Sequence, residues 1–246
     1  MVDRVPSFGD LTLAEFSERL ASDSPTPGGG SASAVAGSLA AALLAMVARL
    51  SLGRPKYADY AASNQRALDL GERSRRRLLE LADDDARAYA GFSAALKLPR
   101  ETADEQRART DATRAAAREA SEVPLAVVRE CAVLLQEIET LVGRSNVNAV
   151  SDLEVGARLC AAAARGAAAN VFINLPMVGD ERYAGGMTAE LNGLLSEVER
   201  TVLQVSQRVA RGGHAGSGSR NPPRPGQRTA RAFSSAQPWR PRCAHT

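Results

Sequence analysis

The chain has 246 residues, enough for one large domain with a sizeable core, but only 4% of them are aromatic. A core built from Ala, Leu and Val favours closely packed helices over a β-sandwich. The formal net charge of +3 arises near the C-terminus, because residues 212–246 carry six arginines and no acid, whereas residues 1–211 hold 25 basic and 28 acidic side chains. The high isoelectric point therefore gives no reason to expect that the body of the chain binds nucleic acid.

Histidine and cysteine usage excludes several kinds of catalytic site. The two histidines, His214 and His245, both lie near the C-terminus, so acid–base chemistry in residues 1–211 must use other side chains. This argues against a Ser-His-Asp or Cys-His arrangement and against a histidine-rich zinc site. The three cysteines form no C-x-x-C motif and the N-terminus has no apolar signal segment, which together predict a cytoplasmic protein with reduced thiols.

Apolar periodicity predicts helices from the N-terminus onward. A short helix is expected over residues 11–21, a second over residues 31–52 with Ser31 as its N-cap, and a long third helix over residues 58–96. The second helix carries no charge from Ser31 to Ala48, which makes it a candidate for a membrane span. Its many Ala, Ser and Gly residues gain little from lipid, so we interpret it as a helix buried between other helices.

Capping boxes and prolines divide the second half of the chain. T-A-D-E at 102–105 and S-D-L-E at 151–154 predict helix starts, and Pro124 is expected in the first turn of another helix. These signals predict helices over residues 103–121, 124–141, 151–175 and 188–211. The fold expected for residues 1–211 is an all-α bundle of six or seven helices, several of them long. Residues 212–246, rich in Gly, Pro and Arg, cannot bury a core and are predicted to be disordered.

Three segments contain residues that a helix bundle does not require. PTPGGGSAS at 25–33 places three glycines before a helix, where free N–H groups could meet a ligand, although the Lys-Ser/Thr of a P-loop is absent. DDDARAY at 83–89 puts three adjacent carboxylates in one helix, where they repel one another. The segment 143–175 carries several amide side chains, among them Asn170 and Asn174 on one helix face. An ordinary turn, a solvated acidic patch and inter-helix hydrogen bonds are the alternative explanations.

Seven motifs resemble, in order, those of the cyclodeaminase/cyclohydrolase family of folate enzymes: SPTPGGGSASA, LGRPKY, LADDDARAY, ALKLP, SEVPL, N-x-N-x-x-SDL-x-x-G and NVFINL. That family includes the C-terminal domain of formimidoyltransferase-cyclodeaminase and stand-alone methenyltetrahydrofolate cyclohydrolases. The similarity extends over about residues 10–211. It implies an all-helical domain that forms a homodimer, with a folate site near the subunit interface.

The resemblance also implies an activity. The enzyme would hydrolyse 5,10-methenyltetrahydrofolate to 10-formyltetrahydrofolate, or cyclise 5-formimidoyltetrahydrofolate to 5,10-methenyltetrahydrofolate with release of ammonia. Neither reaction requires a metal or a cofactor besides the folate substrate, which agrees with a body that lacks histidine. The alternatives are an inactive helical scaffold of the same fold, which would have no use for the triglycine turn, and a nucleic-acid-binding protein acting through its basic tail.

The resemblance further implies which residues form the site. It places the catalytic aspartate in the D-D-D-A stretch, at Asp85 or, as a second choice, at Asp83. Lys56, with Arg54, is expected to meet the glutamate carboxylates of a polyglutamylated folate. The remaining substrate-binding residues are expected to be Pro27, Gly28, Gly29, Gly30, Ser31, Asn148, Asp152, Asn170 and Asn174. No membrane or nucleic-acid partner is expected.

Overall fold

The computed structural model describes residues 7–212, and every regular element within them is helical. Six α-helices are present: α1 (Leu13–Leu20), α2 (Gly29–Ser51), α3 (Ala61–Leu96), α4 (Ala103–Leu141), α5 (Val150–Asn174) and α6 (Glu181–Ala210). Four short 3-10 helices connect them: η1 (Phe8–Asp10), η2 (Pro55–Tyr60), η3 (Val147–Ala149) and η4 (Leu175–Val178). The predicted all-α bundle is thereby confirmed for this part of the chain, whereas the predicted tail lies, from residue 213 onward, outside the described residues.

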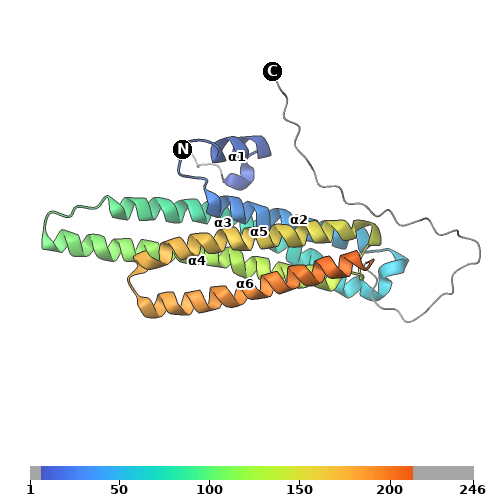
Figure 1. Cartoon of the computed structure of the whole chain (residues 1–246). Helices are drawn as coiled ribbons and strands as arrows, with labels where there is room; N and C mark the ends of the chain where they lie inside the picture. The colour runs from blue at the N-terminus through green and yellow to red at the C-terminus, as the bar shows by residue number, and fades with distance from the viewer. Residues whose placement is uncertain (1–6, 213–246) are drawn as a thin grey trace, which may run out of the picture. The chain divides into compact units, whose positions relative to one another are not determined.

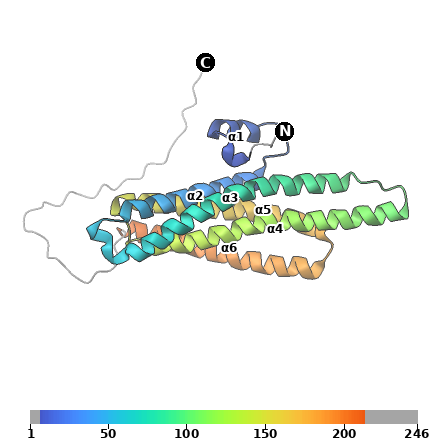
Figure 2. The same ribbon diagram turned by 180° about the vertical axis from the view of Figure 1, so that it is seen from behind.

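Helices α2 to α6 lie lengthwise beside one another (Figure 1). Helix α2 packs against α3 and α5, while α4 packs against α3, α5 and α6. Helices α3 and α4 form a long hairpin that extends past the start of α2, and α1 lies outside the bundle (Figures 1 and 2). Helices α2 and α5 run in opposite directions, so the start of α2 lies beside the end of α5.

Small residues let these helices approach closely. A Cβ on Gly71 of α3 would lie 2.8 Å from the carbonyl oxygen of Ala41, and one on Gly37 of α2 would lie 3.2 Å from the sulfur of Cys131. Among the described residues, α2 is long and apolar enough to cross a membrane by length and composition alone, but 61% of its most apolar window is buried inside the bundle. This agrees with the interpretation of α2 as a core helix.

Three helices, α2, α5 and α6, begin at other residues than the sequence predicts. Helix α2 begins at Gly29 with Gly28 as N-cap, so Ser31 lies inside the first turn and is not a cap. Helix α5 begins at Val150, before the expected capping box at 151–154, which therefore does not form. Helix α6 begins at Glu181, seven residues earlier than predicted, because Asp180 caps it. The capping box at 102–105 is confirmed.

The largest correction concerns Pro124. The two helices expected over residues 103–121 and 124–141 are one continuous helix, α4, with Pro124 buried in its interior. A proline inside a helix cannot donate to the carbonyl four residues before it, which here belongs to Ala120. That carbonyl instead accepts a hydrogen bond of 2.7 Å from the side-chain Nδ2 of Asn174 in α5. A contact between helices therefore satisfies the acceptor that the proline leaves free.

Candidate active site

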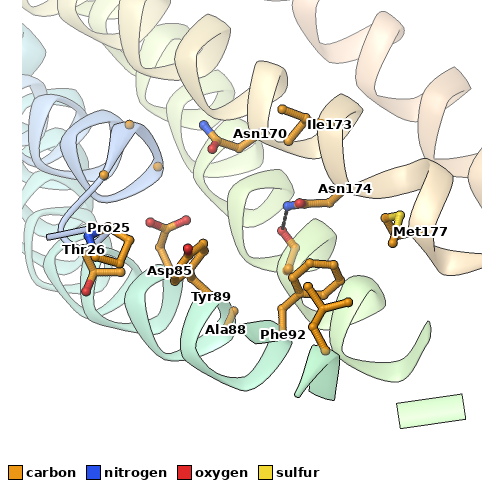
Figure 3. Close-up of a pocket in the computed structure, with 15 residues that line it drawn as sticks. Pro25, Thr26, Asp85, Ala88, Tyr89, Phe92, Asn170, Ile173, Asn174 and Met177 are labelled. Atoms are coloured by element: carbon orange, nitrogen blue, oxygen red, sulfur yellow. Dashed lines mark hydrogen bonds between the residues drawn. The ribbon is translucent and has the colours of Figure 1, made fainter. Parts of the chain in front are cut away.

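A cavity of about 460 Å³ lies where the start of α2, the second half of α3 and the end of α5 meet (Figure 3). It brings together residues from all three segments that the sequence analysis singled out. Its lining consists of Pro25, Thr26, Gly28, Gly29, Gly30, Asp85, Ala88, Tyr89, Phe92, Leu96, Ala120, Asn170, Ile173, Asn174 and Met177. Six of the predicted site residues are in this set, namely Gly28, Gly29, Gly30, Asp85, Asn170 and Asn174.

The carboxylate of Asp85 lies directly against the first turn of α2, toward which it points in Figure 3. A Cβ on Gly30 would lie 2.1 Å from Oδ1 of Asp85, so only glycine allows this approach. The hydroxyl of buried Ser31 donates to Oδ2 at 2.9 Å, and it also lies 3.0 Å from the carbonyl oxygen of Ala82. The helix N-terminus that the sequence suggested for a ligand is therefore occupied by the protein's own carboxylate.

Two opposing effects set the proton affinity of Asp85. Burial raises the pKa of Asp85 above its usual value, and hydrogen bonds from the side chain and backbone of Ser31 counteract part of that rise. The single hydroxyl proton of Ser31 can serve one acceptor at a time. Ionised Asp85 attracts that proton, whereas protonated Asp85 leaves it for the carbonyl of Ala82. A carboxylate with a raised pKa and a hydroxyl that adapts to its charge is suited to act as a general base.

Asn170 and Asn174 face Asp85 from α5 (Figure 3). The Nδ2 of Asn170 donates to the carbonyl of Gly166 at 2.9 Å, and that of Asn174 donates to the carbonyl of Ala120. Because a carbonyl only accepts hydrogen bonds, both bonds determine which end of each amide is the NH₂ group. Each amide is left with its oxygen, which has no hydrogen-bond partner among the described residues. The polar side of the cavity is therefore rich in acceptors.

The other side of the cavity is apolar and was missed by the sequence analysis. Tyr89, Phe92 and Leu96 follow Asp85 along α3, and Ile173 and Met177 face them from the end of α5 and from η4. Ile173 is 74% exposed and Met177 is 44% exposed, which is unusual for large apolar side chains. The spacing of Tyr89, Phe92 and Leu96 at four, seven and eleven residues after Asp85 was a usable signal, because such positions share one helix face.

The three adjacent aspartates point in different directions, and Asp83, the second choice for the catalytic residue, lies outside the cavity. Asp83 accepts hydrogen bonds from the backbone N–H of Phe8, at 2.8 Å, and from the hydroxyl of Ser7. Asp84 forms ion pairs with Arg77 and Arg87. Neither lines the cavity, because neighbouring positions on a helix point about 100° apart. Asp83 attaches the N-terminal segment to α3, and among these three only Asp85 reaches the cavity.

The remaining predicted residues do not line this cavity. Pro27 and Ser31 are buried behind its lining. Lys56, Asn148 and Asp152, with Arg54, lie at the opposite end of α2, where the N–H of Asn146 donates to Ser51 at 2.8 Å. The 23 residues of α2 separate the two ends by roughly 34 Å. Within residues 7–212, no group of three His, Cys, Asp or Glu side chains is placed to hold a metal ion.

Comparison with known proteins identifies clear relatives. Residues 12–193 match the formiminotransferase-cyclodeaminase family model. The chain is 36% identical to a methenyltetrahydrofolate cyclohydrolase of Methylorubrum extorquens, with 82% of this chain and 99% of the relative covered. It is 32% identical to rat formimidoyltransferase-cyclodeaminase, with 81% of this chain but only 37% of that longer protein covered.

A solved structure shares the fold. The crystal structure of formiminotetrahydrofolate cyclodeaminase from Thermotoga maritima superposes with a TM-score of 0.75 at 31% sequence identity. The match covers 82% of this chain and 98% of that one. The similarity therefore extends through the helices that form the cavity.

Proposed function

Because the chain belongs to the formiminotransferase-cyclodeaminase family, we propose that it is a one-carbon folate enzyme whose active site is the cavity around Asp85. Its reaction is hydrolysis of 5,10-methenyltetrahydrofolate to 10-formyltetrahydrofolate, or formation of the same methenyl compound from 5-formimidoyltetrahydrofolate with release of ammonia. The methenyl compound is the substrate of the first reaction and the product of the second, and its carbon between N5 and N10 belongs to a cationic amidinium.

The acceptor-rich polar side of the cavity carries this proposal. It presents the carboxylate of Asp85 and the amide oxygens of Asn170 and Asn174, and the lining, all of it within the described chain, includes no Lys, Arg or His. A partly buried carboxylate attracts a cation strongly, because the interaction is little screened by solvent. The apolar side, with Tyr89 and Phe92, offers a surface for the aromatic part of a folate.

Asp85 acts as the general base in the hydrolytic direction. It accepts a proton from a water molecule as the water oxygen bonds to the amidinium carbon. Asp85 passes this proton to N5 as the bond between N5 and that carbon breaks. The hydroxyl group on the carbon releases its own proton to solvent as the C=O bond forms, which leaves the formyl group on N10 and one proton released overall. In the cyclising reaction N10 attacks the carbon of the protonated formimidoyl group, and Asp85 accepts the proton that N10 loses. Asp85 then gives this proton to the amino group on that carbon, which leaves as ammonia as the cationic amidinium forms.

We also propose that the enzyme is a homodimer with α2 at its interface. The outward face of α2 carries Leu39, Met46 and Leu50, which are 52%, 37% and 38% exposed, and Val155 on the neighbouring α5 is 49% exposed. An apolar row of this kind is typical of a surface that a second copy covers. A two-fold axis across the middle of α2 would bring the Asn148–Asp152 end of one copy beside the Asp85 cavity of the other. The expected roles of Lys56, Asn148 and Asp152 depend on this pairing.

Mixed dimers test that arrangement. Asp85→Asn and Asp152→Asn chains are each expected to be inactive alone. When equal amounts of the two chains are mixed at random, half of the dimers are heterodimers. Each heterodimer has one site with both aspartates intact and one with neither, so the mixture should show about a quarter of the wild-type activity. Leu39→Arg should convert the dimer to a monomer in light scattering. Activity that stays absent in the mixture, or a wild type that is monomeric, would refute the shared site.

The reaction itself is tested with two assays on the purified full chain. One follows loss of the methenyltetrahydrofolate chromophore above its spontaneous hydrolysis, and the other follows ammonia release from formimidoyltetrahydrofolate. Turnover in one assay identifies the reaction, and it should persist with a chelator present, since we propose that no metal or cofactor besides the folate takes part. We propose a cytoplasmic location for this reaction. Folded protein that is inactive in both assays would favour the scaffold alternative.

A further inference from the structure

Pro124 lies at a helix position where proline is unfavourable and where the helical fold needs no proline. It lies in the interior of the 39-residue helix α4, where a proline removes one backbone hydrogen bond and crowds the carbonyl four residues before it. That carbonyl belongs to Ala120, which lines the cavity. Pro124 itself is buried and does not line the cavity. Ala120 is the residue of α4 that lines this cavity, so it is the direct link between Pro124 and the site.

The carbonyl of Ala120 holds one of the two cavity amides. It accepts the Nδ2 of Asn174 at 2.7 Å, across the interface between α4 and α5 (Figure 3). An ordinary residue at 124 would donate its backbone N–H to the same oxygen and draw that oxygen back to the helix axis. The proline prevents both, so the oxygen is free to bind the side chain. Asn170 differs, because its Nδ2 binds Gly166 of its own helix.

We propose that Pro124 is a positioning residue for the reaction, because it keeps the Ala120 carbonyl available to orient the Asn174 amide with its oxygen toward the substrate. This rests on the proposed function, in which that oxygen faces the cationic folate. The orientation follows from the bond, since a carbonyl accepts only from the NH₂ end of the amide. A reversed or loosened amide would present hydrogen-bond donors to a cation, and would repel what it now attracts.

The test is a double-mutant cycle with Pro124→Ala and Asn174→Ala. Each single variant is expected to lower kcat by about tenfold, the usual effect of losing one hydrogen bond to a charged group. Combined, they should lower kcat no more than Asn174→Ala does alone, because both act through one amide. Ser121→Ala is the matched control: its hydroxyl binds the Ala117 carbonyl in the same helix, away from the cavity, and kcat should not change.

Losses that multiply in the double variant, or a Pro124→Ala enzyme with wild-type kcat, would overturn the proposal. Should Pro124→Ala fold poorly because of the lost volume, Pro124→Val keeps most of the volume and still restores the N–H. A readout independent of folate separates this inference from the proposed function. The side-chain NH₂ signals of Asn174 in NMR spectra should exchange faster with water in the Pro124 variants. If the Asn174 signals are the same in the Pro124 variants as in the wild type, the positioning role is refuted. If these signals change but the wild type is inactive on folates, only the proposed function is refuted.

Discussion

The carboxylate of Asp85 fills the space that a side chain on Gly30 would occupy, with Oδ1 only 2.1 Å from the position of a Cβ. This relationship explains one glycine of the triglycine turn by packing and not by contact with a ligand. Gly29 differs, because a Cβ there would meet only Nδ2 of Asn170, at 3.8 Å. Substitutions at these two neighbouring glycines are therefore expected to impair the enzyme in two different ways.

Gly30→Ala is expected to displace Asp85 and to lower kcat by about 100-fold, since a shift of about 1 Å in a catalytic group has effects of this size. Gly29→Val should instead place its side chain in the cavity, raise KM for the folate and leave the helix content unchanged. Steady-state kinetics and circular dichroism distinguish the two. Equal effects on kcat and KM in both variants would contradict the distinct roles.

Ser31→Ala tests the hydroxyl that binds Asp85. The Ser31 hydrogen bond lowers the pKa of Asp85 and so counteracts part of the rise that burial causes. Without this bond the pKa of Asp85 rises further. The acid limb of the pH profile of kcat/KM should therefore move to higher pH, because one charge-assisted hydrogen bond to the ionised carboxylate is lost. Ser38→Ala is the control, because Ser38 lies on the same helix and binds the carbonyl of Arg75 at 3.0 Å, away from the cavity. Similar shifts in both variants would disprove a specific effect on Asp85.

Asp85→Asn should lower kcat by about 10²- to 10⁴-fold, the range expected for loss of a general base. The same change should stabilise the fold at neutral pH. Burial raises the pKa of folded Asp85, so the wild type loses stability as pH rises from the usual aspartate value through the raised one, whereas the variant does not. Urea unfolding from pH 3 to pH 8 should show the stability difference growing with pH. A difference that stays constant would mean that Asp85 is not destabilised by its ionisation.

Asp83→Asn tests which of the two candidate aspartates, Asp85 or Asp83, is the catalytic residue. Asp83 binds the backbone of Phe8 and the hydroxyl of Ser7, outside the cavity, so activity should stay within about twofold of wild type. The N-terminal segment should be held less tightly, by about 1 kcal/mol for the weakened bonds. Hydrogen exchange at Phe8 measures this. Loss of activity with unchanged exchange would return the catalytic role to Asp83.

The sequence by itself determined the helical class, most helix positions and the three segments that form the cavity. Apolar periodicity and the capping box at 102–105 are local signals that hold in the folded chain, whereas the capping box expected at 151–154 does not form because α5 begins at Val150. The cavity segments were recognisable because triglycine, triple aspartate and paired asparagines are costly or unneeded in a plain bundle. The family resemblance was confirmed by the family model, which matches residues 12–193.

Only the tertiary structure decided which of these residues meet. Adjacent aspartates differ by about 100° in direction, so the packing of α2 on α3 places Asp85, and not Asp83, in the cavity. The length of α2 put Asn148 and Asp152 at the opposite end from the cavity, which no spacing in the sequence reveals. Helix α4 continues through Pro124 because Asn174, 50 positions later in the chain, satisfies the free carbonyl of Ala120. Local propensity cannot anticipate such a partner, because the hydrogen bond exists only once α4 and α5 have packed together.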